Sequence, residues 1–163
     1  MESRAKVFGH PIHPMLIVVP LGLFIAAVVF DAIYLWRGSS TLPAVGYWNI
    51  AGGIAGGLVA AVFGFVDWLA IPPGTRAKAI GLWHAFAMIV AIFGFALVFW
   101  TRFTSGDMAT TRGLFAVEVG ALIVGAIGGW LGGELVDRLG VGVYRDANLN
   151  ASNSMSARRS KAA

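Results

Sequence analysis

Three histidines and two acids near the ends of long apolar segments are the side chains in this sequence that could do chemistry. The candidates for cofactor binding or metal ligation are His10, His13, Asp67, His84 and Glu134. Imidazole ligates haem iron and ions such as zinc, iron or manganese, and a carboxylate can join an ion or orient a ligating histidine through its second nitrogen. Because an ionisable group inside a bilayer is costly unless it pairs or faces an interior, these five positions are the best functional clue.

Four long apolar segments must position these side chains. The 163 residues are 58% hydrophobic and 12% charged, with a mean hydropathy of +0.77, which is the composition of a membrane protein. A hydrocarbon core about 30 Å thick needs about 20 apolar residues of helix. The predicted spans cover residues 15–36, 44–71, 80–100 and 113–136. The sequence therefore predicts an all-α integral membrane protein, a four-transmembrane-helix bundle with short loops.

The basic residues that flank the spans predict their orientation. Most lysines and arginines lie on the side of the two termini: Arg4, Lys6, Arg76, Lys78, Arg138, Arg145, Arg158, Arg159 and Lys161. The opposite side holds Arg37, Arg102 and Arg112. By the positive-inside rule both termini are cytoplasmic, which places all five candidate side chains near the cytoplasmic side. Residues 1–143 are expected to form the transmembrane domain and 144–163 a flexible basic cytoplasmic tail.

Small residues four positions apart predict where the helices touch, because helices in lipid associate through close contact. The stripes are Gly52, Gly56, Ala60 and Gly64 in the second span and Gly125, Gly129 and Gly133 in the fourth, where Gly128 and Gly132 form an adjacent stripe. Asp67 continues the first stripe and is expected to face another helix, whereas Glu134 points away from the second stripe. Pro20 lacks a backbone N–H and predicts a kink in the first span.

The two halves of the chain also share a pattern. Each half begins with a histidine, His13 or His84, and ends with an acid on a glycine-rich helix, Asp67 or Glu134. Similar halves with the same direction through the membrane would form a parallel repeat.

Other residues narrow the function classes. Asp31 and Glu118 lie on the opposite side of the membrane and are expected to pair with arginines at the headgroups. No ladder of acids crosses the bilayer centre, so proton transfer is disfavoured. No GxSxG motif, P-loop or cysteine is present, which argues against a hydrolase, iron–sulfur ligation by thiolates and covalent c-type haem. The net charge of +4 comes from basic residues that flank the apolar spans, where they act as topology signals, so a nucleic-acid partner is not expected.

Several short motifs resemble the bacterial DUF2231 family of predicted membrane proteins over about residues 8 to 143. They are Gly9-His10-Pro11-Ile12-His13-Pro14, Phe30-Asp31, Gly64-Phe65-Val66-Asp67-Trp68, Gly81-Leu82-Trp83-His84 and Gly129-Trp130-Leu131-Gly132-Gly133-Glu134-Leu135-Val136. The resemblance implies a bacterial inner-membrane protein. Some similar proteins are joined to Rieske or cytochrome c domains, which implies membrane redox chemistry by association. In Rieske-linked relatives the position matching Glu134 is often histidine, which implies that this side chain faces inward.

Two hypotheses follow for these residues. In the first, His10 or His13 joins His84, Asp67 and Glu134 around haem b or a divalent metal ion, and the protein is a redox accessory protein or subunit without independent catalytic activity. In the alternative, the protein is a structural subunit of a membrane complex without a cofactor, and its histidines and acids form buried hydrogen-bonded pairs. The expected partners are the lipid bilayer and other membrane redox subunits, with a homo-oligomer left open.

Overall fold

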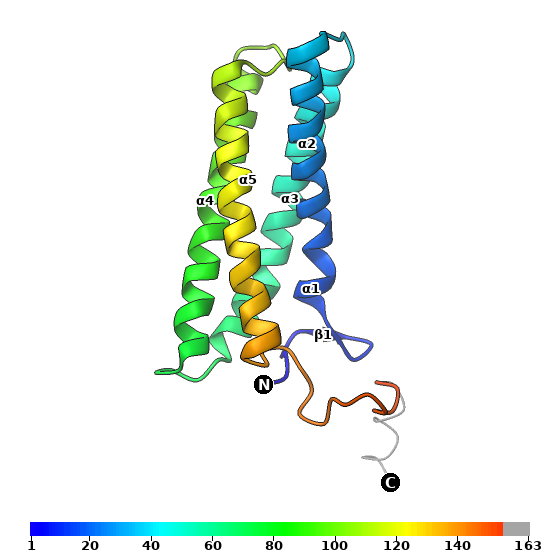
Figure 1. The fold of residues 1–163 in the computed structure, drawn as a ribbon, viewed down its shortest axis with the longest axis vertical. Coiled ribbons are helices and arrows are strands. Elements are labelled where there is room, and N and C mark those ends of the chain that lie inside the picture. The colour runs from blue at the N-terminus through cyan, green and yellow to red at the C-terminus, as the bar shows by residue number, and fades with distance from the viewer. Residues whose placement is uncertain (155–163) are drawn as a thin grey trace.

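Four membrane-length helices form the protein. The computed structural model describes residues 1–154. Within them, four helices are long and apolar enough to cross a membrane: Ile12–Arg37, Leu42–Leu69, Arg76–Thr104 and Arg112–Arg138. Consecutive helices run in opposite directions and lie side by side in one elongated bundle (Figure 1). The predicted all-α four-helix architecture is confirmed.

The first span is divided at Ile17 into α1 (Ile12–Leu16) and α2 (Val18–Arg37). Pro20 lies in the next turn and cannot donate the hydrogen bond that a regular helix would make there. The chain bridges the break with a bond from the N–H of Ile17 to the carbonyl of His13 at 3.2 Å. The interruption lies in the turn that precedes Pro20, and the kink predicted at Pro20 stays a prediction.

The other spans are α3 (Leu42–Leu69), α4 (Arg76–Thr104) and α5 (Arg112–Gly133), and α5 continues as a π-helical turn, η1 (Glu134–Arg138). Threonine hydroxyls cap α4 and α5, since each accepts a hydrogen bond from a backbone N–H of the first turn. α4 ends at Thr104, beyond the predicted boundary at residue 100, and so includes Arg102 in the helix.

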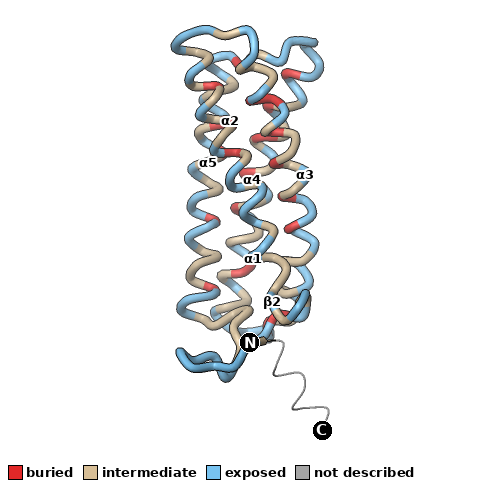
Figure 2. Tube along the Cα trace, turned by 90° about the vertical axis from the view of Figure 1, so that its right-hand side faces the viewer, coloured by how far each residue is buried: buried red, intermediate tan, exposed pale blue. Residues whose placement is uncertain are grey.

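The helices pack as two hairpins. Contacts are most extensive within α2–α3 and within α4–α5. The core that joins the hairpins consists of Phe24, Ala27, Ile50, Phe95, Val98 and Ala121. Buried positions follow the inner faces of the helices and exposed positions the outer faces (Figure 2). Many exposed side chains are large and apolar, as expected where the surrounding solvent is lipid.

The glycine stripes of the two hairpins behave differently. In α3, a Cβ at Gly52, Gly56 or Gly64 would lie within about 3 Å of a side chain of α1 or α2, so this predicted stripe is confirmed as a helix contact. In α5, nothing lies within 4 Å of a Cβ at Gly129 or Gly133, and Gly128 and Gly132 make the contact with α4 instead. The predicted contact is therefore confirmed for Gly125 and for the adjacent stripe of Gly128 and Gly132, and it is wrong for Gly129 and Gly133.

Both ends of the described chain lie at one end of the bundle, called here the terminal end; the opposite end is the loop end (Figure 1). A short hairpin, β1 (Lys6–Val7) and β2 (His10–Pro11), precedes α1. Its two-residue turn has positive φ angles at Phe8 and Gly9, as a type I′ hairpin turn requires. The tyrosine hydroxyl of Tyr144 donates to the carbonyl of Gly9, so residues beyond η1 pack on this hairpin. Arg158, Arg159 and Lys161 of the predicted tail lie outside the described residues.

Candidate functional site

His13 lies in α1 and is held by the neighbouring helix α3. Its Nδ1 is 2.8 Å from the carbonyl oxygen of Ala60. A carbonyl can only accept, so Nδ1 carries the proton and donates it, and in a neutral imidazole Nε2 then holds a free lone pair. The side chain is half-buried.

His84 repeats this arrangement in the second hairpin. Its Nδ1, on α4, is 2.8 Å from the carbonyl oxygen of Gly128 on α5. The same reasoning makes Nδ1 the donor and Nε2 the free nitrogen. Neither Nε2 atom has a hydrogen-bond partner among residues 1–154. Each hairpin therefore presents one oriented imidazole with an available lone pair.

The two imidazoles face one another across the boundary between the hairpins. Their ring centroids are 6.2 Å apart, and the ring planes are nearly perpendicular at 88°. The two histidines, which the sequence predicts near the same side of the membrane, thus lie at the same level of the bundle. Donation of one ring N–H to a backbone carbonyl fixes the tautomer and the orientation of an imidazole.

A glycine makes room for each imidazole. A Cβ at Gly64 would lie 2.9 Å from Cε1 of His13, and a Cβ at Gly132 would lie 3.3 Å from Cε1 of His84. Larger residues at these positions would push against the rings. The same arrangement therefore occurs twice. A backbone carbonyl holds the ring, and a glycine one helical turn later leaves room for it.

The other three candidate residues lie apart from this pair and have partners of their own. Asp67 accepts hydrogen bonds from the hydroxyl of Ser3 at 2.7 Å and the backbone N–H of Arg4 at 2.8 Å. Glu134 pairs with Arg76 at 2.6 Å. The exposed His10 lies 3.5 Å from the hydroxyl of Ser154.

The five candidate side chains do not form one cluster. Within residues 1–154, no group of three or more histidine, cysteine, aspartate or glutamate side chains is arranged to hold a metal ion. Asp67 instead fastens the segment before α1 to the end of α3, and Glu134 at the start of η1 fastens the first residue of α4. The structure brings His13 and His84 together. That His10, Asp67 and Glu134 join them around a cofactor stays a prediction.

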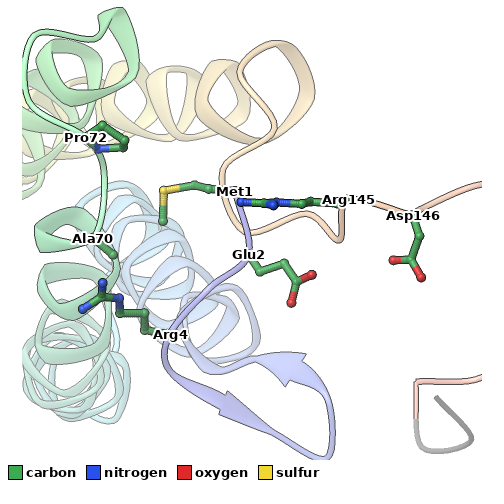
Figure 3. A pocket seen from close by; sticks show the side chains of 7 residues that line it. All are labelled: Met1, Glu2, Arg4, Ala70, Pro72, Arg145 and Asp146. Atoms are coloured by element: carbon green, nitrogen blue, oxygen red, sulfur yellow. The ribbon is translucent and has the colours of Figure 1, made fainter. Parts of the chain in front are cut away.

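One cavity of about 600 Å³ opens at the terminal end (Figure 3). It is lined by Met1, Glu2, Arg4, Ala70, Pro72, Arg145 and Asp146. It lies between the N-terminal segment and the chain beyond η1, and neither histidine of the pair lines it. The cavity is thus separate from the histidine site.

A second polar cluster lies at the loop end, and its burial was not predicted. Arg102 and Asp31 form a salt bridge with a 2.6 Å separation, and both side chains have no exposed area. Glu118 is also fully buried, with an oxygen 3.6 Å from the guanidinium of Arg102. The expected pairing of these acids with an arginine is present, and the side chains are buried between the helices. Arg102 could have been found only by extending the third span past its last apolar residues.

The described residues thus define a four-helix membrane protein whose two hairpins each hold an oriented histidine against the other. The chain matches the DUF2231 family, described as predicted membrane proteins, over residues 9–145. The match covers most of the sequence, and the chain belongs to this family, as the resemblance over residues 8 to 143 predicted. Comparisons with curated proteins and with solved structures gave no match.

Proposed function

We propose that the protein binds haem b between its two hairpins, where His13 and His84 would hold it, and that it serves as an electron-transfer accessory protein or subunit in the bacterial inner membrane. The facing pair of imidazoles with free Nε2 atoms is the observation that supports this proposal. Haem b requires no covalent attachment, which suits a chain without cysteine.

The separation of the rings suits two axial ligands. A nitrogen–metal bond of about 2 Å places a ring centroid about 3 Å from the metal, so two imidazoles on opposite sides have centroids about 6 Å apart. The observed 6.2 Å agrees with this distance. An edge-to-face contact of two imidazoles without a cofactor is the competing explanation, and it corresponds to the structural alternative.

The hydrogen bonds to Ala60 and Gly128 have a chemical role in this proposal. A ligating histidine commonly donates its other ring N–H to a carbonyl, which fixes the tautomer and increases the basicity of the ligating nitrogen. Both carbonyls belong to helix backbones, so they hold the two rings at fixed positions. The haem would supply one-electron chemistry, and the two imidazoles of the protein would hold it.

Two imidazoles fit this role better than they fit a single ion. Tetrahedral zinc sites take three or four protein ligands, whereas the described residues offer only this pair at one point. We place the site near the cytoplasmic side because the basic residues of the loops and termini favour that side for the terminal end. Electron donors and acceptors in the same membrane are the partners that this role requires.

Absorption spectroscopy of the purified, haem-reconstituted protein tests the proposal. We expect a Soret band that is lost in His13→Ala and in His84→Ala, and retained in the control His10→Ala, which removes an exposed histidine outside the pair. In His84→Met, a methionine thioether can replace one imidazole as an axial ligand, and we expect an altered spectrum with an unchanged fold.

Three results would contradict haem binding: a colourless protein after reconstitution, a Soret band that survives loss of both histidines, or a stoichiometric divalent ion found by metal analysis in place of haem. A divalent ion would retain a cofactor role for the pair. A colourless, metal-free protein would favour the structural alternative.

A further inference from the structure

The loop-end cluster contains more carboxyl groups than its arginine can neutralise. Asp31 on α2, Arg102 on α4 and Glu118 on α5 all have 1% or less of their surface exposed. One positive and two negative charges in such a place would leave an uncompensated charge in a medium of low dielectric constant, which is expensive. The charge count alone requires an explanation.

Arg102 already uses its donors elsewhere. Nη1 donates to Asp31 at 2.6 Å, Nη2 donates to the carbonyl of Pro43 at 2.9 Å, and Nε donates to the carbonyl of Met108 at 2.7 Å. Glu118 is 3.6 Å from Nη1, beyond hydrogen-bond distance. The guanidinium is therefore committed to Asp31 and to the backbone.

Glu118 is only partly satisfied by the residues around it. Its Oε1 accepts a hydrogen bond from the hydroxyl of Thr110 at 3.1 Å. Its Oε2 receives no hydrogen bond from any donor among residues 1–154. The same nitrogen of Arg102, Nη1, lies 2.6 Å from Oδ2 of Asp31 and 3.6 Å from Oε1 of Glu118, so the two carboxyl groups lie beside each other. Two carboxylates in contact cannot both be ionised at low cost, whereas one proton between them turns repulsion into a hydrogen bond.

We propose that Asp31 and Glu118 hold one proton between them, so that the loop-end cluster is a buried proton-binding site of net zero charge inside the membrane domain. The proton resides mainly on Oε2 of Glu118. This O–H group donates a hydrogen bond to Asp31, which keeps its ion pair with Arg102. The remaining groups that face the cluster are uncharged, namely Tyr47 on α3, whose ring centroid is 5.8 Å from the guanidinium carbon of Arg102, and Thr110 in the α4–α5 loop. Asp107, Arg37 and Arg112 at the same end are exposed to the surroundings.

This site is independent of haem. Asp31 lies 18 residues beyond His13, about 27 Å at 1.5 Å per residue of helix. The proton-binding pair and the histidine pair therefore occupy opposite ends of the bundle, and either proposal can fail without the other.

Infrared difference spectroscopy of the full-length protein in membranes tests the proposal. At neutral pH we expect the carbonyl stretching band of a protonated carboxylic acid, shifted on transfer to D₂O. The band should disappear in Glu118→Gln, where Asp31 alone pairs with Arg102. It should also disappear in Asp31→Asn, because Glu118 then becomes the ionised partner of Arg102. The control Asp107→Asn removes an exposed carboxyl of the same end and should leave the band unchanged.

A further variant covers the case in which the neutral substitutions disturb the fold. In Thr110→Val the side chain keeps nearly the same shape, but the hydrogen bond from the hydroxyl to the side-chain oxygen Oε1 of Glu118 is lost. We expect the band to remain and to move to higher frequency. Absence of the band from the unaltered protein would overturn the proposal. So would a band that survives Glu118→Gln, or one lost in Glu118→Gln but kept in Asp31→Asn, since the proton would then not be shared.

Discussion

Phe24 and Phe95 stack with their ring centroids 4.0 Å apart and their planes within 6° of parallel. Phe24 lies 11 residues after His13, and Phe95 lies 11 residues after His84. The paired phenylalanines and the paired histidines thus occupy the same positions in α1–α2 and in α4. Because these two spans run in the same direction, the hairpins are related as a parallel repeat.

The same register continues to the loop end. Asp31 pairs with Arg102, 71 positions further along the chain, and 71 positions also separate the two histidines and the two phenylalanines. The internal similarity of the halves predicted from the sequence is therefore visible in three contacts across the bundle. The predicted match between Asp67 and Glu134 does not extend to their contacts, since Asp67 binds the N-terminal segment and Glu134 binds Arg76.

A methyl group at Gly64 is expected to weaken cofactor binding. A Cβ there would lie 2.9 Å from Cε1 of His13, so the ring must move and lose its bond to Ala60. Loss of such an orienting bond typically costs about 10- to 100-fold in affinity, and we expect that loss for Gly64→Ala in a haem titration. Gly129→Ala is the matched control, because nothing lies within 4 Å of its Cβ. Equal affinities of the two variants would contradict the prediction.

Removal of the loop-end arginine is expected to destabilise the whole bundle. Arg102→Gln leaves two buried acids without a positive partner, and breaking a buried pair in this way costs about 3–5 kcal/mol. The measurement is the free energy of unfolding in mixed detergent micelles. The control Arg112→Gln changes an exposed arginine of the same end and should stay within about 0.5 kcal/mol of the unaltered protein. Similar losses of unfolding free energy in both variants would show that the burial of Arg102 makes no particular contribution to stability.

Substitution of Asp67 is expected to release the N-terminal segment. Asp67→Asn weakens the hydrogen bonds from Ser3 and Arg4, and loss of bonds to a charged group costs about 1–3 kcal/mol. That range corresponds to amide hydrogen exchange about 5- to 150-fold faster at Arg4. The control Asp137→Asn changes an exposed acid at the same end. The Soret band of the variant also tests the predicted role of Asp67 at the cofactor, since a band lost together with the N-terminal contact would support that role.

The stacked phenylalanines are expected to couple the two hairpins energetically. A double-mutant cycle of Phe24→Ala and Phe95→Ala should give an interaction free energy of about 0.5–1.5 kcal/mol, which is usual for aromatic pairs. Thermal or detergent unfolding provides the four measurements. A second cycle that combines Phe24→Ala with Phe86→Ala, an exposed position, should be additive. Additivity in the first cycle would mean that the stack contributes nothing beyond the separate side chains.

Hydropathy was sufficient to predict the four spans, because the length of an apolar run is a local property of the sequence. The boundary at the end of α4 was harder to place. Arg102 appears in a window of sequence as a charged residue after an apolar run, which normally marks a helix end. Its actual burial depends on Asp31 and Glu118, which come from two other helices, and no local pattern contains that information.

The candidate site was likewise predictable only where local sequence carries the information. The level of His13 and His84 followed from helix length and was predictable. The carbonyls that hold their rings belong to Ala60 and Gly128, and a backbone acceptor on a neighbouring helix leaves no signature in residue types. The β1–β2 turn was also not predicted. A type I′ turn is usually indicated by Asn-Gly or Asp-Gly in the sequence, whereas this turn contains Phe8 and Gly9.

The two carbonyl anchors also separate the orientation of the histidines from their pairing. His13 is held by α3 and His84 by α5, so each imidazole obtains its orientation within a single helical hairpin. The contact between the two rings, by contrast, lies between the hairpins. A change that loosens the packing of one hairpin against the other is therefore expected to separate the rings while each stays anchored to its own carbonyl.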